Sequence, residues 1–311
     1  MKRIETIIGI ICLLALVLLP ALACDTEEET SDTAYITITD QFGRTVILDS
    51  IPDRIISLAP SNTEILFALG LEDKIVGITQ YCDYPPEAEN ITKIGGFSTI
   101  DMEKIIELAP DLILAANMHK DTDVPELDRR GFNVLTIAPE TIDDVMFNID
   151  LIGNATGAEG IARTLITDLE NRIKEVHDKV ATLVDEEKPG VLYITWHDPL
   201  WTLGEGTITH ELIEMAGGQN IVDDISGHGQ IDLETVIWRN PQIILASTGH
   251  GSAEDSPLIW AQTEDRLSHI DARLNNRIYQ VDADLVTRPG PRIIDGLELI
   301  AGLIHPELFG E

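Results

Sequence analysis

The sequence Ile100-Asp-Met-Glu-Lys-Ile-Ile-Glu-Leu-Ala-Pro-Asp-Leu-Ile-Leu-Ala115 recurs 131 residues later as Ile231-Asp-Leu-Glu-Thr-Val-Ile-Trp-Arg-Asn-Pro-Gln-Ile-Ile-Leu-Ala246, with eight of sixteen positions identical. Each copy places an aspartate at a helix N-cap, a glutamate in the first turn and apolar residues at helical spacing. A proline then ends the helix, and a short aliphatic run follows it. Each copy therefore predicts a helix followed by a buried parallel strand, which is half of a doubly wound α/β domain.

Because this unit occurs twice, the sequence predicts two similar doubly wound α/β lobes. The chain has 311 residues, which suits two domains, and its hydrophobic content of 44% is enough for a core in each. Clefts between domains are common binding places for small molecules. We therefore expect a ligand cleft between the two lobes.

The N-terminal lobe shows the alternation of strands and helices that is typical of a parallel sheet. Residues 35–39 and 45–48 flank a turn and predict a hairpin ahead of this sheet. Ser61-Asn-Thr-Glu64 has the spacing of a capping box and predicts that a helix begins there and runs to Gly70. The strands of the sheet are expected at residues 54–58, 75–78, 111–115 and 133–137.

A long helix is predicted between the lobes. Thr156-Gly-Ala-Glu159 is a second capping box, and apolar residues then recur every three or four positions from Ile161 to Leu183. The pattern stops at Lys188-Pro-Gly190, where a strand of the second lobe begins. The predicted organisation is an N-terminal lobe at 34–155, a connecting helix at 156–187 and a C-terminal lobe at 188–311. A single rigid connecting helix favours small closure over large hinge motion.

The N-terminus carries an export signal. Two basic residues precede an apolar run at residues 7–19, which is too short to span a bilayer, and Pro20-Ala-Leu-Ala23 then leads to Cys24. Residues 1–23 resemble a lipoprotein signal peptide, with Cys24 as the lipidated mature N-terminus; the alternative is an ordinary secretory signal. Either reading places the mature chain outside the cytoplasm, in the periplasm or anchored to the outer face of the cell membrane. Residues 24–33 are acidic and polar and predict a flexible tether.

The net charge limits the classes of binding partner, and the cysteine content limits the disulfides that the chain can form. A formal net charge of −33 disfavours binding to nucleic acid and to anionic lipid, so membrane association is expected to come from acyl chains. Besides the two cysteines of the signal region, the chain holds only Cys82. No disulfide within the mature chain is therefore expected.

The stretch from Arg54 to Gly70 and the loop Tyr81-Cys-Asp-Tyr-Pro-Pro86 carry a resemblance that extends from about residue 36 to residue 308. They resemble the substrate-binding proteins of ABC importers that have a helical backbone, and most of all the vitamin B12 (cobalamin) binding proteins. The turn Gly217-Gly-Gln-Asn220 is a further mark of this class. The resemblance implies a monomer that is not an enzyme and has no cofactor of its own. It would capture a corrinoid and deliver it to a permease dimer with ATPase subunits.

The resemblance also implies a ligand site with aromatic walls. Tyr81, Phe97 and Trp201 are its candidates, together with Arg288 of the C-terminal lobe; the alternative for the three rings is packing in a core. A corrin ring is broad, apolar and edged by amides, so flat aromatic surface with a few polar anchors suits it. Where cobalamin binders offer a tryptophan, this chain has His228, which we expect to touch the ligand. A lone histidine is a weak metal signal, so no metal site is predicted.

Glu103 and Glu234 occupy the same position in the two repeats. An acid in the first helical turn offsets the helix dipole, which stabilises a helix by about 0.3–1 kcal/mol. The resemblance adds a second role for both glutamates, which is docking onto arginines of the two permease subunits.

Other functions remain open from the sequence. Siderophore and haem binders share the scaffold that the chain resembles. A two-lobed chelatase or lyase is an alternative of another class, but the phosphate-loop, dinucleotide, zinc-protease and hydrolase motifs are missing from the sequence. A protein that captures a metal ion is a further alternative, but it would need several convergent histidines and carboxylates as ligands. The last alternative is a purely structural surface protein, which would need no ligand cleft.

Overall fold

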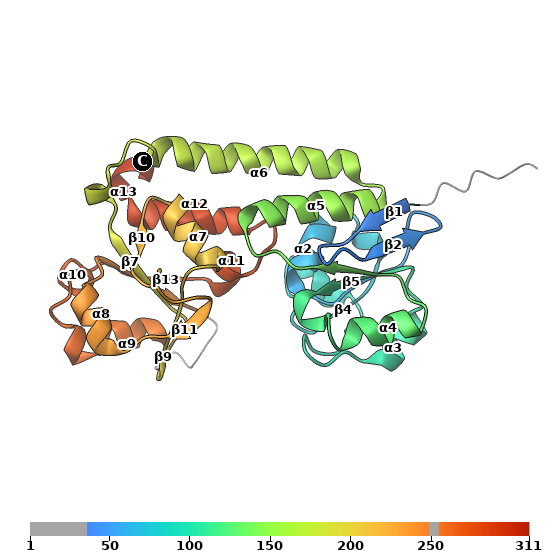
Figure 1. Ribbon diagram of the computed structural model, residues 1–311, viewed down its shortest axis with the longest axis horizontal. Coiled ribbons are helices and arrows are strands. Elements are labelled where there is room, and N and C mark those ends of the chain that lie inside the picture. Colours follow the sequence, from blue (N-terminus) through green and yellow to red (C-terminus); the bar gives the residue numbers. More distant parts are fainter. Residues whose placement is uncertain (1–35, 249–254, 311) are drawn as a thin grey trace, which may run out of the picture. The chain divides into compact units, whose positions relative to one another are not determined.

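The computed structural model describes residues 36–248 and 255–310 (Figure 1). The predicted signal peptide, the acidic tether and the lipidation site at Cys24 lie outside the described residues. No helix within the described ranges is long and apolar enough to cross a membrane. Cys82 is the cysteine of the described part, and it is buried and free.

The N-terminal lobe consists of a hairpin and a parallel sheet, as predicted. Strands β1 and β2 pair antiparallel, and the four-stranded sheet has the order β4-β3-β5-β6 with every pair parallel. The lobe contains β1 (Ile36–Thr39), β2 (Thr45–Leu48), β3 (Ile55–Ser57), α2 (Pro60–Ala68), β4 (Ile75–Ile78), α3 (Met102–Leu108), β5 (Leu112–Ala116), α4 (Asp123–Arg129), β6 (Val134–Ile137) and α5 (Ile142–Thr156).

The C-terminal lobe follows the connecting helix α6 (Glu159–Val180), and its described residues form two sheets. Its parallel sheet has the order β10-β7-β12-β13, and a smaller antiparallel sheet has the order β11-β9-β8. The elements of this lobe are β7 (Gly190–Ile194), β8 (Trp196–His197), β9 (Leu200–Leu203), α7 (Ile208–Met215), β10 (Gln219–Asn220), β11 (His228–Gln230), α8 (Leu233–Arg239), β12 (Ile243–Ser247), α9 (Pro257–Thr263), α10 (Asp271–Leu274), β13 (Ile278–Val281), α11 (Ala283–Thr287), α12 (Ile293–Ile304) and α13 (Pro306–Phe309).

The repeated sequence forms the same unit in both lobes. The Asp101 carboxylate accepts a hydrogen bond from the backbone N–H of Lys104 at the start of α3, and Asp232 accepts one from Thr235 at the start of α8. Each helix ends in a left-handed residue directly before the proline, at Ala109 (φ 41°) in α3 and at the equivalent asparagine in α8. The residue before a proline is disfavoured in the helical region, which explains why both helices stop there.

Helices cover both faces of each parallel sheet, which confirms the doubly wound prediction (Figure 1). Leu112 and Leu114 of β5 join the core on the side of α2 and α5, while Ile113 joins a separate cluster with residues of α3 and α4. The repeat extends this alternation to β12, where Ile243 points to one core and Ile244 to the other. Successive strand residues face opposite sides of a sheet, so this aliphatic run is buried on both faces.

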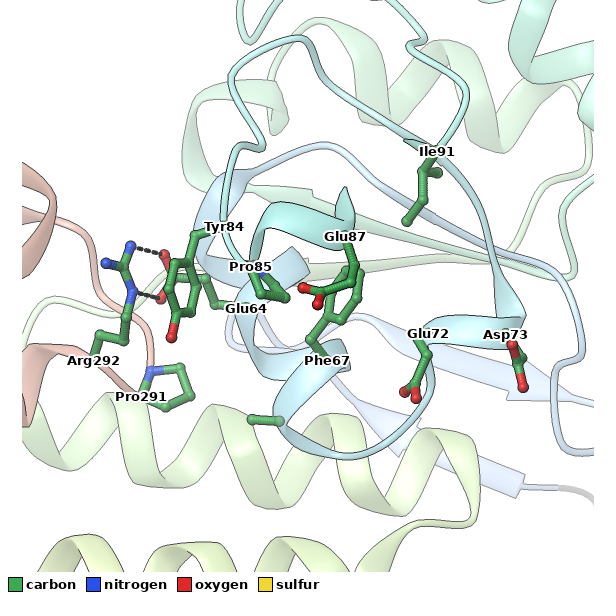
Figure 2. Close-up of a pocket in the computed structure, with 11 residues that line it drawn as sticks. Glu64, Phe67, Glu72, Asp73, Tyr84, Pro85, Glu87, Ile91, Pro291 and Arg292 are labelled. Atoms are coloured by element: carbon green, nitrogen blue, oxygen red, sulfur yellow. Dashed lines mark hydrogen bonds and ion pairs between the residues drawn. The ribbon is translucent and has the colours of Figure 1, made fainter. Parts of the chain in front are cut away.

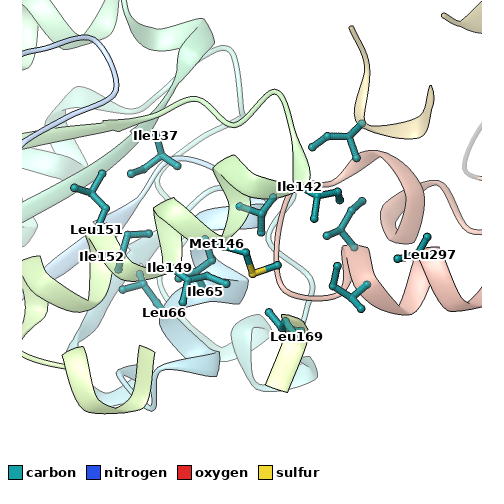
Figure 3. Close-up of a cluster of buried hydrophobic side chains, with 14 of the residues drawn as sticks. Ile65, Leu66, Ile137, Ile142, Met146, Ile149, Leu151, Ile152, Leu169 and Leu297 are labelled. Carbon is teal, nitrogen blue, oxygen red and sulfur yellow. The ribbon is translucent and has the colours of Figure 1, made fainter. Parts of the chain in front are cut away.

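Each lobe has a core of its own, as expected, on only one face of its parallel sheet. This is the face covered by α3 and α4 in the N-terminal lobe and by α8 and α9 in the C-terminal lobe. The largest cluster of buried side chains, called here the shared core, runs from α2 and α5 through α6 to α12 (Figure 3). It includes Leu66 and Ile149 from the N-terminal lobe, Leu169 from the connecting helix and Leu297 from the C-terminal lobe. Helix α6 packs against both α5 and α12, because its buried residues form one face.

The two predicted capping boxes are wrong. Helix α2 begins at Pro60 with Ala59 as its N-cap, so Ser61 and Glu64 lie inside the helix. Thr156 is the last residue of α5, and its hydroxyl donates back to the Ile152 carbonyl (2.7 Å). Gly157 (φ 73°) then ends α5, and α6 begins two residues later without a side-chain cap. The connecting helix is accordingly shorter than the predicted segment 156–187.

Candidate functional site

A pocket of about 710 Å³ lies where the strands of the N-terminal sheet end. Its N-terminal walls come from segments that follow β3, β4, β5 and β6, which is the edge where open α/β sheets bind ligands. Residues 284–289 of the C-terminal lobe close the opposite side, so we call it the interlobe pocket. Its lining residues are Ala59, Pro60, Ser61, Tyr81, Phe97, Ala116, Asn117, Met118, Asp121, Ile137, Ala138, Pro139, Glu140, Asp284, Thr287, Arg288 and Pro289.

The structure brings three of the five predicted ligand residues together in this pocket: Tyr81, Phe97 and Arg288. Tyr81 is 55% exposed, so its ring is available to a ligand and is not part of a core. Phe97 is half-buried. Whether these side chains bind a ligand stays a prediction.

His119 holds the Phe97 wall in place and was missed by the sequence analysis. Its Nδ1 accepts a hydrogen bond from the backbone N–H of Ala116 (3.0 Å), so Nε2 carries the proton and donates to the Phe97 carbonyl (2.7 Å). The two rings also meet edge to face at 5.5 Å. His119 is fully buried, and it fixes the loop after β4 against the turn after β5.

Arg288 is held by three carboxylates. Its guanidinium donates to Glu64 Oε1 (3.0 Å) and Asp83 Oδ1 (3.0 Å) of the N-terminal lobe, and it pairs with Asp284 of its own lobe (2.6 Å). Burial lowers the pKa of Arg288, but the hydrogen bonds to Asp83 and Glu64 and the charge of Asp284 outweigh this and raise it. Arg288 therefore stays charged, with much of its donor capacity in use.

Arg292 binds the same buried glutamate. Its Nη2 lies 2.6 Å from Glu64 Oε1 and its Nε lies 3.1 Å from Oε2, while the Glu64 side chain is only 2% exposed. Gly290 lies between the two arginines, and a Cβ there would come within 3.1 Å of Glu64 Oε2. We call Glu64, Arg288 and Arg292 the interlobe clasp, because it ties α2 to the segment before α12.

A second pocket of about 570 Å³ lies beside the clasp (Figure 2). Arg292 forms one wall and lies 3.7 Å above the Tyr84 ring, while Phe67 and Ile91 form apolar surface. Burial lowers the pKa of Arg292, and the hydrogen bond to Glu64 with its charge more than compensates. Glu64 and Arg292 of the clasp line this pocket, and Arg288 lines the interlobe pocket.

Trp201 and His228 lie together, but neither lines the interlobe pocket. They belong to neighbouring strands β9 and β11 of the antiparallel sheet, with ring centroids 4.7 Å apart. Trp201 is a residue of strand β9 and does not lie in a loop. His228 is exposed, and its Nε2 is 3.2 Å from the Thr195 hydroxyl. Their contact with a ligand stays a prediction.

Glu103 and Glu234 are exposed in the first turns of α3 and α8. Within the described ranges, neither carboxylate has a cation within ion-pair distance. The same part of the chain contains no group of three or more histidines, cysteines and acids placed to hold a metal.

Comparison with known proteins identifies relatives over most of the chain. A family model described as periplasmic binding protein matches residues 55–285. The ABC transporter substrate-binding lipoprotein YvrC of Bacillus subtilis is 35% identical over 281 residues, covering 89% of this chain and 87% of that protein. A vitamin B12-binding protein of Vibrio cholerae is 30% identical over 250 residues, covering 80% and 87%.

A solved structure agrees with this relationship. It is described as a possible iron-binding (periplasmic solute-binding) protein from Staphylococcus epidermidis. Its TM-score is 0.72 at 30% identity, and the match covers 82% of this chain and 100% of that one.

Proposed function

Because the chain belongs to the periplasmic binding protein family and is a substrate-binding protein of an ABC transporter, we propose that it captures a cobalamin-like corrinoid in the interlobe pocket. It then delivers this ligand to the permease, which works with ATPase subunits. The vitamin B12-binding relative supports this choice of ligand.

The charge balance of the interlobe pocket carries the proposal. Asp121, Glu140 and Asp284 line it, and Arg288 is the single lysine or arginine among its described lining residues. Arg288 already binds three carboxylates, so an anionic ligand finds no free cation there. A corrin ring is edged by neutral amides, whose N–H groups donate to carboxylates. Haem carries carboxylates that are ionised at neutral pH, and these would face like charges.

Calorimetry on the mature protein tests the proposal. Titration with cyanocobalamin, cobinamide, haemin and a ferric siderophore is expected to show one corrinoid bound per chain. Haemin and the siderophore are expected to bind more weakly than the two corrinoids. An absorption spectrum of the protein as purified adds an independent identification, since the three ligand classes absorb differently. A preference for haemin or the siderophore over both corrinoids would refute the ligand and leave the transport role standing.

One observation favours an iron-containing ligand as the second candidate. The exposed Tyr81 lines the interlobe pocket, and a tyrosine oxygen is a known axial ligand of haem iron. The solved relative described as possibly iron-binding fits the same reading. Replacement of Tyr81 by phenylalanine separates the two candidates, because it removes the oxygen donor and keeps the aromatic surface that a corrin ring uses.

We further propose that Cys24 carries the lipid anchor on the extracytoplasmic side. YvrC, which is named a lipoprotein, supports this assignment. Mass spectrometry of the membrane-extracted chain tests it, and Cys24→Ser is expected to release the protein from the membrane.

A further inference from the structure

The start of helix α2 forms part of the wall of the interlobe pocket. Ala59, Pro60 and Ser61 all line this pocket. The helix has nine residues, and its N-cap, Ala59, makes no side-chain hydrogen bond to the first turn. The first backbone N–H groups of a helix have no partner within the helix, so they depend on a cap, on water or on a ligand.

Two backbone donors remain in the first turn of α2. Pro60 has no N–H, and the N–H of Thr63 donates to the Ala59 carbonyl (3.1 Å). Within the described ranges, the N–H groups of Ser61 and Asn62 have no acceptor. They lie at the positive end of the helix dipole, where a negatively charged group is stabilised.

Ser61 adds a hydroxyl to these two donors. The residue is 8% exposed, and its hydroxyl makes no hydrogen bond to the part of the chain that the structure describes. The hydroxyl is not fully enclosed by protein, so its accessible side faces the pocket that Ser61 lines. Burial of a polar group costs free energy unless a hydrogen bond compensates, and most buried polar groups have a partner. An acceptor on a ligand in the pocket would supply this hydrogen bond.

The charges near this turn leave the helix dipole effective. Glu64 follows in the next turn, where an uncompensated acid would oppose the binding of an anion. Its carboxylate binds both Arg288 and Arg292, so its charge is neutralised. The carboxylates that line the pocket come from the segments after β5 and β6 and from α11. The start of α2 therefore offers neutral hydrogen-bond donors to an anionic oxygen.

We infer that the start of α2 binds the phosphodiester of a corrinoid that carries a nucleotide loop, through the N–H groups of Ser61 and Asn62 and the Ser61 hydroxyl. This inference rests on the proposed capture of a corrinoid. A phosphodiester carries one negative charge on two acceptor oxygens, which suits neutral donors at a helix start. The side-chain amides of the corrin ring are uncharged, so this contact selects the nucleotide loop. The protein therefore prefers cobalamin to cobinamide, which lacks that loop.

Calorimetry with cyanocobalamin and dicyanocobinamide tests the inference. Wild type is expected to bind cyanocobalamin more than about tenfold more tightly than dicyanocobinamide. Ser61→Ala removes one of the three donors and is expected to lower this ratio about three- to tenfold. Ser61→Asp places a carboxylate beside the phosphodiester, so the two ligands are expected to bind with nearly equal affinity.

Two controls distinguish a lost ligand contact from a damaged helix. An acid in the first turn stabilises a helix, so Ser61→Asp is expected to melt at or above the temperature of wild type. Ser98→Ala is the matched control, because this serine is exposed and lies outside the lining of the pocket. It is expected to keep the wild-type ratio of affinities.

Phosphorus NMR of cyanocobalamin gives a second measurement. Binding is expected to shift the phosphorus resonance with wild type and with Ser98→Ala, and to shift it less with Ser61→Ala. A purely structural role of Ser61 would leave the resonance of the bound ligand unchanged.

The outcomes separate this inference from the proposed function. If both Ser61 variants weaken cyanocobalamin and dicyanocobinamide equally, or weaken neither, α2 does not bind the phosphodiester and the inference is wrong. If wild type binds the two corrinoids equally tightly, the inference also fails, but the capture of a corrinoid stands. If wild type prefers haemin to both corrinoids, the proposed ligand fails together with the inference.

Discussion

Arg292 and Glu64 are 228 residues apart in the chain, yet two nitrogens of the guanidinium reach both oxygens of the carboxylate, at 2.6 and 3.1 Å. Arg288 donates to the same carboxylate, so one buried glutamate of the N-terminal lobe binds two arginines of the C-terminal lobe. Such a group is sensitive to the loss of any one member, because the remaining charges stay buried.

Removal of the Glu64 charge is therefore expected to destabilise the protein. Glu64→Gln leaves two largely buried arginines with less countercharge, and the free energy of unfolding should fall by on the order of 3–5 kcal/mol. Denaturant unfolding measures this. The control is Arg266→Gln, which breaks the exposed pair with Glu264 and should change stability by less than about 1 kcal/mol. Equal effects of the two variants would contradict the clasp.

Gly290 offers a test that leaves every charge in place. Gly290→Ala adds a Cβ about 3.1 Å from Glu64 Oε2, so the carboxylate must shift away from its arginines. A lower melting temperature is expected. Gly160→Ala is the matched control on the connecting helix, where nothing lies within 4 Å of the added methyl. Alanine is the better helix former, so this control should gain about 0.5–1 kcal/mol.

Truncation of the predicted aromatic residues should weaken ligand binding without unfolding the protein. Tyr81→Ala is expected to cost about 1–3 kcal/mol of binding free energy, because it removes flat apolar contact from the interlobe pocket. Trp201 lies outside the lining of this pocket, so Trp201→Ala is expected to show a similar loss only if the bound ligand extends to β9. Calorimetry and a thermal melt are measured on the same samples. A large drop in melting temperature would show that the ring in question is structural.

Charge reversal at the repeated glutamates should separate transport from ligand binding. Glu103→Arg and Glu234→Arg are expected to leave corrinoid affinity unchanged and to impair uptake in reconstituted vesicles, with the double variant worst. Each exposed contact is weak, about 0.2–1 kcal/mol, but both lobes must engage the permease. Glu175→Arg on α6 controls for net charge. If the double variant takes up ligand as well as wild type, the two glutamates offset the helix dipoles but do not contribute to docking.

Glu211 on α7 is expected to give a pH-dependent stability term. Burial raises the pKa of its carboxyl, although the backbone N–H of Ile142 donates to it at 2.9 Å and partly offsets this. Above the raised pKa the charged group therefore opposes folding. As the pH falls through that pKa, the folded state binds a proton before the unfolded state does, and stability increases.

The Glu211→Gln variant isolates this term. Wild type is expected to gain stability relative to the variant as the pH falls from neutral to about 4.3, the ordinary glutamate value. Denaturant midpoints across this range measure the difference, and a constant difference between the two proteins would show that Glu211 does not titrate in this way.

The fold was predictable because its determinants are local and repeated. The aspartate caps, the proline stops and the aliphatic runs each act within about ten residues, and two copies of the same pattern support each other. The predicted strand boundaries lie within one or two residues of the observed ones for the same reason. The capping-box pattern failed at Ser61, because Pro60 already starts the helix and leaves the serine in its first turn.

The site was only partly predictable, because its decisive contacts are distant in the chain. The sequence pointed to Tyr81, Phe97 and Arg288, which the structure brings to one pocket. Nothing near Glu64 indicates that its partners lie more than 220 residues away. The sequence does contain two arginines that flank Pro-Gly-Pro at 288–292. This motif indicates an ion pair with Glu64 only when the contact between α2 and the start of α12 is known.

The shared core makes the two lobes a single cooperative unit. Leu66 and Leu297 are buried in one cluster with residues of α6 between them, so the inner sheet faces are not sealed by either lobe alone. A chain cut between α5 and α6 would expose apolar surface on both fragments, and the intact protein should melt in one transition despite its duplicated architecture. The two lobes share one architecture, but each depends on the other lobe and on α6 to bury its apolar residues.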